Sequence, residues 1–173
     1  TSVLGFAINA WQERYPELAP TLDPIFTDRG REFLATTADA CIADSALRWA
    51  FHDTRDFTTT GQPLSVAVIE PPAMRKLVDA QKLGRQSPSA PIMISTAGND
   101  DVVPSDQVVQ LARDHCALGA DVTFYDSALP PITPGIKSAV NHAVGIYSHI
   151  GPSMQWMYDR FNGVPNASNC GTF

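Results

Sequence analysis

The amino-acid sequence predicts an α/β fold, preceded along the chain by a mostly helical segment. A short apolar run at 92–95, bounded by Pro91 and Gly98, is typical of a strand buried on both faces. Apolar residues at helical spacing follow, and a second apolar run begins at Val122. Strand, helix and strand within about 35 residues indicate a parallel crossover unit. Because two strands do not make an independent sheet, we expect further strands from residues outside this chain or from another chain.

The first half of the chain is expected to be helical, because its apolar residues recur at helical spacing. Prolines interrupt the pattern over 16–26 and allow only short turns there. Thr27 or Asp28 can cap the helical pattern that follows. The polar, Thr-rich stretch 52–65 predicts a loop before a brief apolar run. Helices are therefore expected over 1–15, once or twice within 27–51, and over 71–84, where prolines begin the helix and Gly84 ends it.

Two helices are expected in the second half. Ser105 or Asp106 caps the first, which ends at Gly119. Its buried face is expected to carry Val108, Val109, Ala112 and Cys116. The second helix begins with Pro152 in its first turn and ends at Asn162 and Gly163. Its buried stripe is expected to contain Met154, Met157, Tyr158 and Phe161.

Charge and composition argue against several classes of partner. The net charge is −6, and the basic residues are scattered singly, so nucleic acid is not an expected partner. No run approaches the roughly 18 apolar residues of a membrane-spanning helix, and the first residues lack the pattern of a signal peptide. We expect a soluble chain whose targeting signal has been removed or lies elsewhere.

Asp100, Asp101 and His142 are the candidate catalytic residues. The aspartates follow the first expected strand, and His142 lies in the loop that leaves the second. Since the carboxyl ends of parallel strands share one edge, these loops can meet there. A carboxylate bonded to one imidazole nitrogen prepares the other nitrogen to take a proton, as in a Ser-His-Asp triad. Alternatives are an ordinary acidic turn, a metal site built from the same three residues, and an amino-terminal nucleophile at Thr1.

Several segments resemble the secretory lipases of the α/β-hydrolase superfamily, the family of Candida lipase A. They are "YPELAPTL", "TDRGREFLATTADACIAD", "PIMISTAGNDDVVP", "CALGADVTFYD", "NHAVG" and "DRFNGVPNASNC", which together cover nearly the whole chain. The family's turn matches "DDVVP", which implies Asp100 as the triad acid; a Gly-x-x-Asp spacing from Gly98 would give Asp101 instead. The family's histidine corresponds to His142, although Asn141 stands where the family usually has glycine, and the preceding loop is longer.

The Gly-x-Ser-x-Gly motif of a nucleophilic serine is absent from the sequence, and Ser153 has only the first glycine. The resemblance therefore implies the C-terminal part of a secreted serine lipase or esterase, with the serine before Thr1. Its expected substrates are acyl esters of the triacylglycerol type, or smaller esters. Its expected partners are the N-terminal half of the enzyme and, transiently, a lipid interface. No cofactor or metal is implied. The alternative is a non-catalytic fragment that binds lipid or protein.

On this resemblance, residues 1–85 form a helical lid or cap, and residues 86–173 form the C-terminal part of the hydrolase core. Apolar residues of the lid are candidates to face the acyl chain or lipid, with helix packing as the alternative; they are Phe6, Trp11, Phe26 and Phe51.

The remaining cysteines, histidines and one asparagine have expected roles of their own. The cysteine spacing excludes a paired zinc motif. In a secreted protein, Cys116 and Cys170 could form a disulfide, with Cys41 pairing outside the chain. His52, His115 and His149 are expected to be solvated or packed in the core, away from the candidate site. Asn166 begins a pattern that accepts glycans in secreted eukaryotic proteins.

Overall fold

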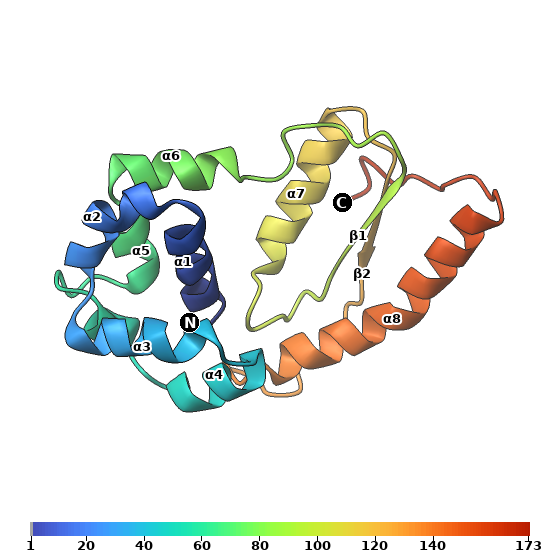
Figure 1. The fold of residues 1–173 in the computed structure, drawn as a ribbon. Coiled ribbons are helices and arrows are strands. Elements are labelled where there is room, and N and C mark those ends of the chain that lie inside the picture. Colours follow the sequence, from blue (N-terminus) through green and yellow to red (C-terminus); the bar gives the residue numbers. More distant parts are fainter. Residues whose placement is uncertain (1) are drawn as a thin grey trace. The chain divides into compact units, whose positions relative to one another are not determined.

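A computed structural model describes residues 2–173, and it divides the chain into two compact units (Figure 1). The first unit ends at Lys82 and the second spans Leu83–Phe173. Thr1, the alternative nucleophile considered from the sequence, lies outside the described residues. Among these residues no helix is long and apolar enough to cross a membrane.

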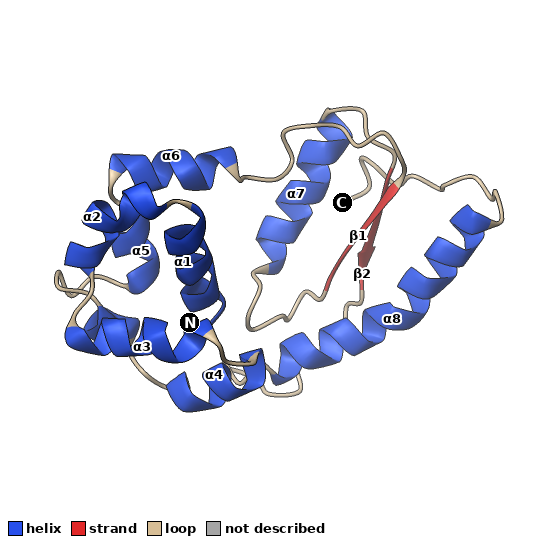
Figure 2. Cartoon of the chain, in the orientation of Figure 1, coloured by secondary structure: helices blue, strands red, loops and turns tan. Residues whose placement is uncertain are grey.

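The described part of the first unit consists of helices joined by short turns (Figure 2). The helical expectations for this half are confirmed, and Thr27 caps α3 by accepting a hydrogen bond from the Gly30 amide at 3.1 Å. The stretch expected to be a loop contains the 3-10 helix η3, and the apolar run after it is helical. The elements are α1 (Ser2–Arg14), η1 (Pro16–Leu18), α2 (Ala19–Leu22), η2 (Asp23–Ile25), α3 (Asp28–Ala38), α4 (Ile42–Trp49), η3 (Thr54–Phe57), α5 (Leu64–Ile69) and α6 (Pro72–Ala80).

Three aromatic rings form the centre of the first unit's core. Phe33 stacks on Phe57 at 4.8 Å, and Trp49 meets both rings edge-on at 5.4 Å. Gly30 allows α3 to lie close to the backbone of Phe57, since a Cβ at this position would be 2.2 Å from the Phe57 carbonyl oxygen. Phe26 is also buried in this core, so of its two expected roles it has helix packing and not contact with lipid. The unit therefore has an apolar core of its own.

The second unit contains the predicted crossover. Strand β1 (Ile92–Thr96) is followed by α7 (Ser105–Ala117) and β2 (Val122–Asp126), and the strands are parallel, in register from Ile92↔Val122 to Thr96↔Asp126. Ala112 of α7 packs with Val122 and Phe124 of β2. Helix α8 (Val140–Phe161) completes the unit. An α/β arrangement with a two-stranded sheet is thus present within the described residues.

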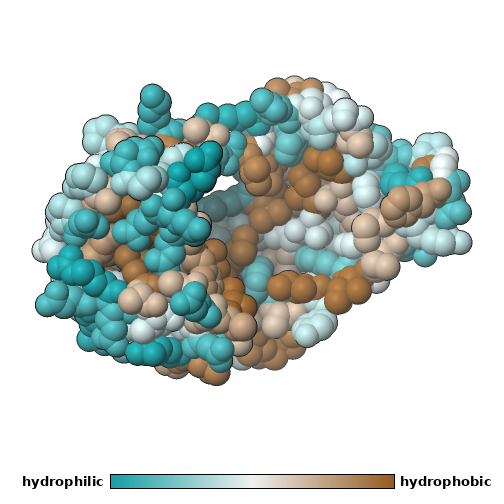
Figure 3. Space-filling view, viewed as in Figure 1, coloured by the Kyte–Doolittle hydropathy of each residue, from teal (hydrophilic) through white to brown (hydrophobic). Residues whose placement is uncertain are grey.

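Helix α8 differs most from the sequence expectation. It begins at Val140 and runs for 22 residues, so Pro152 lies inside it and not in its first turn. A proline removes one backbone hydrogen bond from a helix interior, which is why the sequence pattern indicated a helix start there. The stripe expected to be buried is exposed, from 41% at Met157 to 90% at Phe161. Apolar colours accordingly lie on the surface over α8 (Figure 3).

Two smaller expectations for the second unit are also wrong. Neither Ser105 nor Asp106 caps α7 with its side chain, because the cap position is Pro104. Residues 92–95 of β1 are only partly buried, whereas burial on both faces was expected. Within the described residues β1 has one neighbouring strand, β2, which leaves its other edge without a strand.

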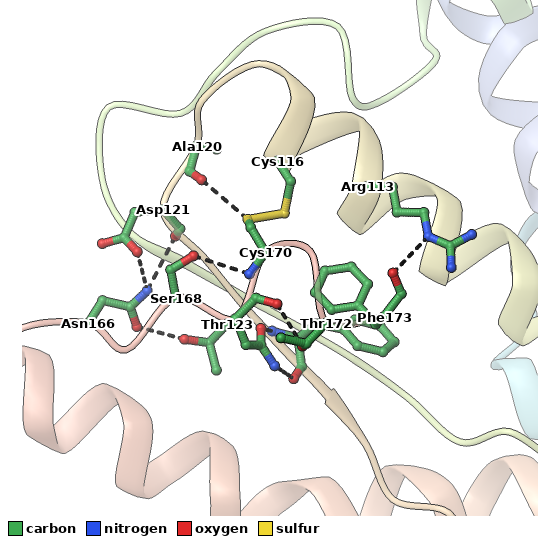
Figure 4. The surroundings of a disulfide bond; sticks show 12 residues. Arg113, Cys116, Ala120, Asp121, Thr123, Asn166, Ser168, Cys170, Thr172 and Phe173 are labelled. Atoms are coloured by element: carbon green, nitrogen blue, oxygen red, sulfur yellow. Dashed lines mark hydrogen bonds between the residues drawn. A yellow bond between two sulfur atoms is a disulfide. The ribbon is translucent and has the colours of Figure 1, made fainter.

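The C-terminal tail is attached to α7 and β2, as Figure 4 shows. The expected disulfide between Cys116 and Cys170 is present. Asn169 donates to the Phe124 carbonyl at 2.8 Å and accepts from its amide at 2.7 Å, so the tail covers one edge of β2. The Asn166 amide group donates to Asp121, and its oxygen accepts from Thr123 and other donors. In this fold, the side chain of the glycan-acceptor pattern is engaged in hydrogen bonds.

Replacing Cys170 with serine is expected to lower the free energy of unfolding by about 4 kcal/mol, because the disulfide spans 54 residues and restricts the unfolded chain. Denaturant unfolding of the protein that contains this chain measures the difference. Cys116→Ser is the matched comparison, since it removes the other half of the same bridge and should cost about as much. Equal stabilities of Cys170→Ser and wild type would contradict the expectation.

Candidate active site

The loop after β1 folds around Asp100. The Asp100 amide donates to the Ala97 carbonyl at 2.9 Å, which turns the chain as it leaves the strand. One carboxylate oxygen, Oδ1, accepts hydrogen bonds from the amides of Val102 and Val103, both at 2.8 Å. These contacts fix the side chain and leave Oδ2 for another partner.

That partner is His142. Its Nδ1 lies 2.7 Å from Asp100 Oδ2, and the two side chains are 29% and 11% exposed. His142 was expected in a loop, but it is the third residue of α8. Within the described residues its Nε2 has no hydrogen-bond partner. The pair therefore has the geometry in which a carboxylate orients an imidazole and leaves the far nitrogen accessible to a reacting group.

Opposing effects act on the pKa of Asp100. Partial burial raises it, while the hydrogen bond from His142 and those from the Val103 and Val102 amides lower it. The hydrogen bonds together outweigh the effect of burial. The pKa of Asp100 therefore lies below its usual value, and the carboxylate stays ionised at neutral pH.

An NMR titration of the Asp100 carboxyl carbon is expected to give a midpoint below the value of about 3.9 for a free aspartate. Because the folded-state pKa is lowered, ionised Asp100 stabilises the fold above its unfolded pKa, and this contribution is lost as pH falls through the folded pKa. In His142→Asn the midpoint should move upward. A wild-type midpoint above the usual value would contradict this account.

Asp101, the alternative triad acid, has different partners. Its Oδ2 accepts from the amides of Ser138 at 2.9 Å and Ala139 at 2.8 Å, and its Oδ1 accepts from the His142 amide at 3.1 Å. It therefore contacts the backbone of His142, while Asp100 contacts the ring. The metal-site alternative would need Asp100, Asp101 and His142 to face one cation, whereas Asp101 faces backbone amides. No cluster of three His, Cys, Asp or Glu side chains suited to a metal occurs within residues 2–173.

A pocket of about 290 Å³ opens beside the Asp100–His142 pair, entirely within the second unit. The end of β1 contributes Ser95 and Thr96, and α8 contributes His149. His149 was expected to lie away from the site, and this is wrong because α8 is unbroken from His142 to His149, about two turns further along the helix. The His149 ring lies edge-on to Tyr125 at 5.5 Å, and its buried Nε2 has no partner within the described residues.

The other polar residues singled out in the sequence lie elsewhere. His52 belongs to the first unit, where its Nδ1 contacts Arg29. His115 is on α7, and its Nδ1 is buried without a partner in the described chain. Ser153 lies within α8 and does not form a strand-to-helix turn. Sequence reasoning missed His149 and the role of Asp101; the seven-residue spacing of the two histidines on one helix was the available signal for His149.

The carboxylate and histidine thus pair beyond the carboxyl ends of two parallel strands, where α/β folds gather functional side chains. The family model for secretory lipases matches residues 1–169. The chain belongs to the secretory lipase family.

Curated relatives agree with this family assignment. The chain is 26% identical over 162 residues to a probable inactive lipase of Mycobacterium tuberculosis, covering 93% of this chain and 33% of that protein. It is 26% identical to a secreted triacylglycerol lipase of Malassezia globosa, covering 90% of this chain and 33% of the relative. A similar Malassezia furfur lipase is 22% identical, with 90% and 30% covered. The chain thus spans about a third of the length of these relatives. No solved structure matches it.

Proposed function

We propose that this chain is the C-terminal part of a secreted serine lipase, and that it supplies the acid and the histidine of the catalytic triad. The observation that carries the proposal is the 2.7 Å hydrogen bond between Asp100 Oδ2 and His142 Nδ1 in a member of the secretory lipase family. Similarity to secreted triacylglycerol lipases supports triacylglycerols or related acyl esters as substrates.

In the proposed reaction, a serine outside this chain attacks the ester carbonyl. His142 Nε2 takes the serine proton and then donates it to the leaving alcohol, which leaves an acyl-enzyme. His142 next takes a proton from water as the water oxygen attacks the acyl-enzyme carbonyl, and it returns that proton to the serine oxygen as the ester bond breaks and the fatty acid leaves. Asp100 holds the ring in the tautomer with hydrogen on Nδ1 and stabilises the imidazolium that forms in each half-reaction.

The rest of the chain has roles that follow from this proposal. Residues 86–173 would join an α/β-hydrolase sheet through the free edge of β1. Residues 1–85 would serve as a helical lid or cap. Several of its apolar side chains are exposed and suited to transient contact with a lipid interface, including Phe51 at 97% and Leu47 at 80% exposure.

The second candidate is a non-catalytic protein that binds lipid or another protein and retains the pair as an inherited feature. Similarity to a probable inactive lipase favours this alternative. Ester cleavage distinguishes the two candidates, because a binding protein would take up lipid without cleaving it.

Release of fatty acid from emulsified triacylglycerol and from a soluble short-chain ester tests the proposal, using the protein that contains this chain. The enzyme is expected to release acid from both substrates, and water should be consumed in proportion to the acid formed. Binding of the glyceride with no release from either ester would reject the enzyme and support the alternative.

A further inference from the structure

We infer that Asp101 is a positioning residue for His142: its carboxylate caps the start of α8 from a separate loop and so fixes where the histidine lies relative to Asp100. The inference rests on the proposed function, because it assigns Asp101 a part in presenting the proposed base.

The start of α8 is capped only in part by its own sequence. The first amides of a helix have no partner within the helix, and a side-chain oxygen usually accepts them. The residue at the cap position is Ala139, which has no polar side chain and adopts a left-handed conformation with φ 63°. The Ser138 hydroxyl is a local acceptor, and it takes the Val140 amide at a long distance of 3.4 Å. The amides of Ser138, Ala139 and His142 are accepted from elsewhere in the chain.

Asp101 provides the missing acceptor from a position about forty residues earlier in the sequence. Its carboxylate accepts the amides of Ser138, Ala139 and His142, at 2.9, 2.8 and 3.1 Å. The His142 amide is the third in the helix, one of the amides that a capping side chain normally accepts. A negative charge at this end also interacts favourably with the helix dipole.

The two neighbouring aspartates thus hold His142 at two points. Asp100 accepts from its ring, and Asp101 accepts from its backbone amide. Because the aspartates are adjacent in the chain, the ring and the start of the helix are fixed to one short loop. Movement of α8 relative to the end of β1 would disturb both contacts together.

Other contacts near the start of α8 leave this role to Asp101. Buried Asn141 accepts from the amides of Ile132 and Thr133, and so attaches the preceding loop to the helix. Further along, Gly145 passes close to Ala97, since a Cβ on Gly145 would lie 2.8 Å from the Ala97 Cβ. Neither contact bonds to His142.

Steady-state kinetics of Asp101→Asn and Asp101→Ala, in the protein that contains this chain, test the inference. A displacement of about 1 Å at a catalytic group costs on the order of 100-fold in rate. We expect kcat to fall roughly 10- to 100-fold with KM little changed, and Asp101→Asn to lose less because its amide oxygen remains an acceptor. If the alanine variant does not fold, the asparagine variant carries the test.

The matched control is Asp121→Asn, which removes a carboxylate at the opposite end of β2, bonded to Asn166. It should reduce stability without lowering kcat. If both Asp101 variants lose stability but keep kcat within about two-fold of wild type, the role is merely structural and the inference is overturned. If His142→Asn and Asp100→Asn leave activity intact, the proposed function itself fails, so the two failures can be distinguished.

Discussion

Replacing His142 with asparagine is expected to lower kcat/KM for ester hydrolysis by roughly 10⁴- to 10⁶-fold. Asparagine has no group that takes a proton near neutral pH, so the proposed serine would lose its base. Initial rates on a soluble ester, at equal concentrations of folded protein, measure the loss. Thermal unfolding of each variant identifies the folded fraction.

His149→Asn is the comparison for this substitution, because His149 lies on the same helix and lines the same pocket but does not bond to Asp100. Its loss should be far smaller. Equal losses in the two variants would mean that the pocket as a whole matters and not the ring bonded to Asp100. No loss in His142→Asn would exclude His142 as the base.

Asp100→Asn is expected to lower kcat by about 10⁴-fold while the fold survives. The asparagine oxygen can still accept the amides of Val102 and Val103, whereas its NH₂ group would face His142 Nδ1. An NH₂ donor there stabilises the tautomer with hydrogen on Nε2, which cannot take the serine proton. KM should change little, because the lost interaction belongs to the transition state.

Comparison with Asp101→Asn decides which aspartate is the acid. The structure pairs Asp100 with the ring and Asp101 with the backbone, so the loss in Asp100→Asn should be the larger by at least about ten-fold. A larger loss in Asp101→Asn would transfer the role of acid to Asp101 and contradict the geometry.

The crossover unit could be predicted from the sequence because its signals are local. The apolar runs of β1 and β2 and the helical spacing between them lie within one continuous segment. The Cys116–Cys170 disulfide was likewise accessible from spacing and compartment. Local pattern also explains why α1, α3 and α6 were predicted, whereas the short helices η3 and α5 were missed.

The start of α8 could not be predicted in this way. Its cap, Asp101, lies about forty residues earlier in the sequence. Pro152, which is typical of a first helical turn, lies in the interior of α8 and so indicated a false start. This error placed His142 in a loop and His149 away from the site. The choice between Asp100 and Asp101 also depended on three-dimensional contacts, since both spacings were compatible with the sequence. Asn141 accepts the amides of Ile132 and Thr133 in the loop before α8, a contact that the sequence did not indicate.

A fluorescent phosphonate that labels activated serines tests whether His142 activates a serine outside this chain. The protein that contains this chain is treated before any dissociation, and the labelled peptide is then identified by mass spectrometry. The account predicts a label on a serine outside residues 1–173 in wild type, and its loss in His142→Asn. A label on Ser153 or another serine of this chain, or equal labelling of wild type and His142→Asn, would contradict it.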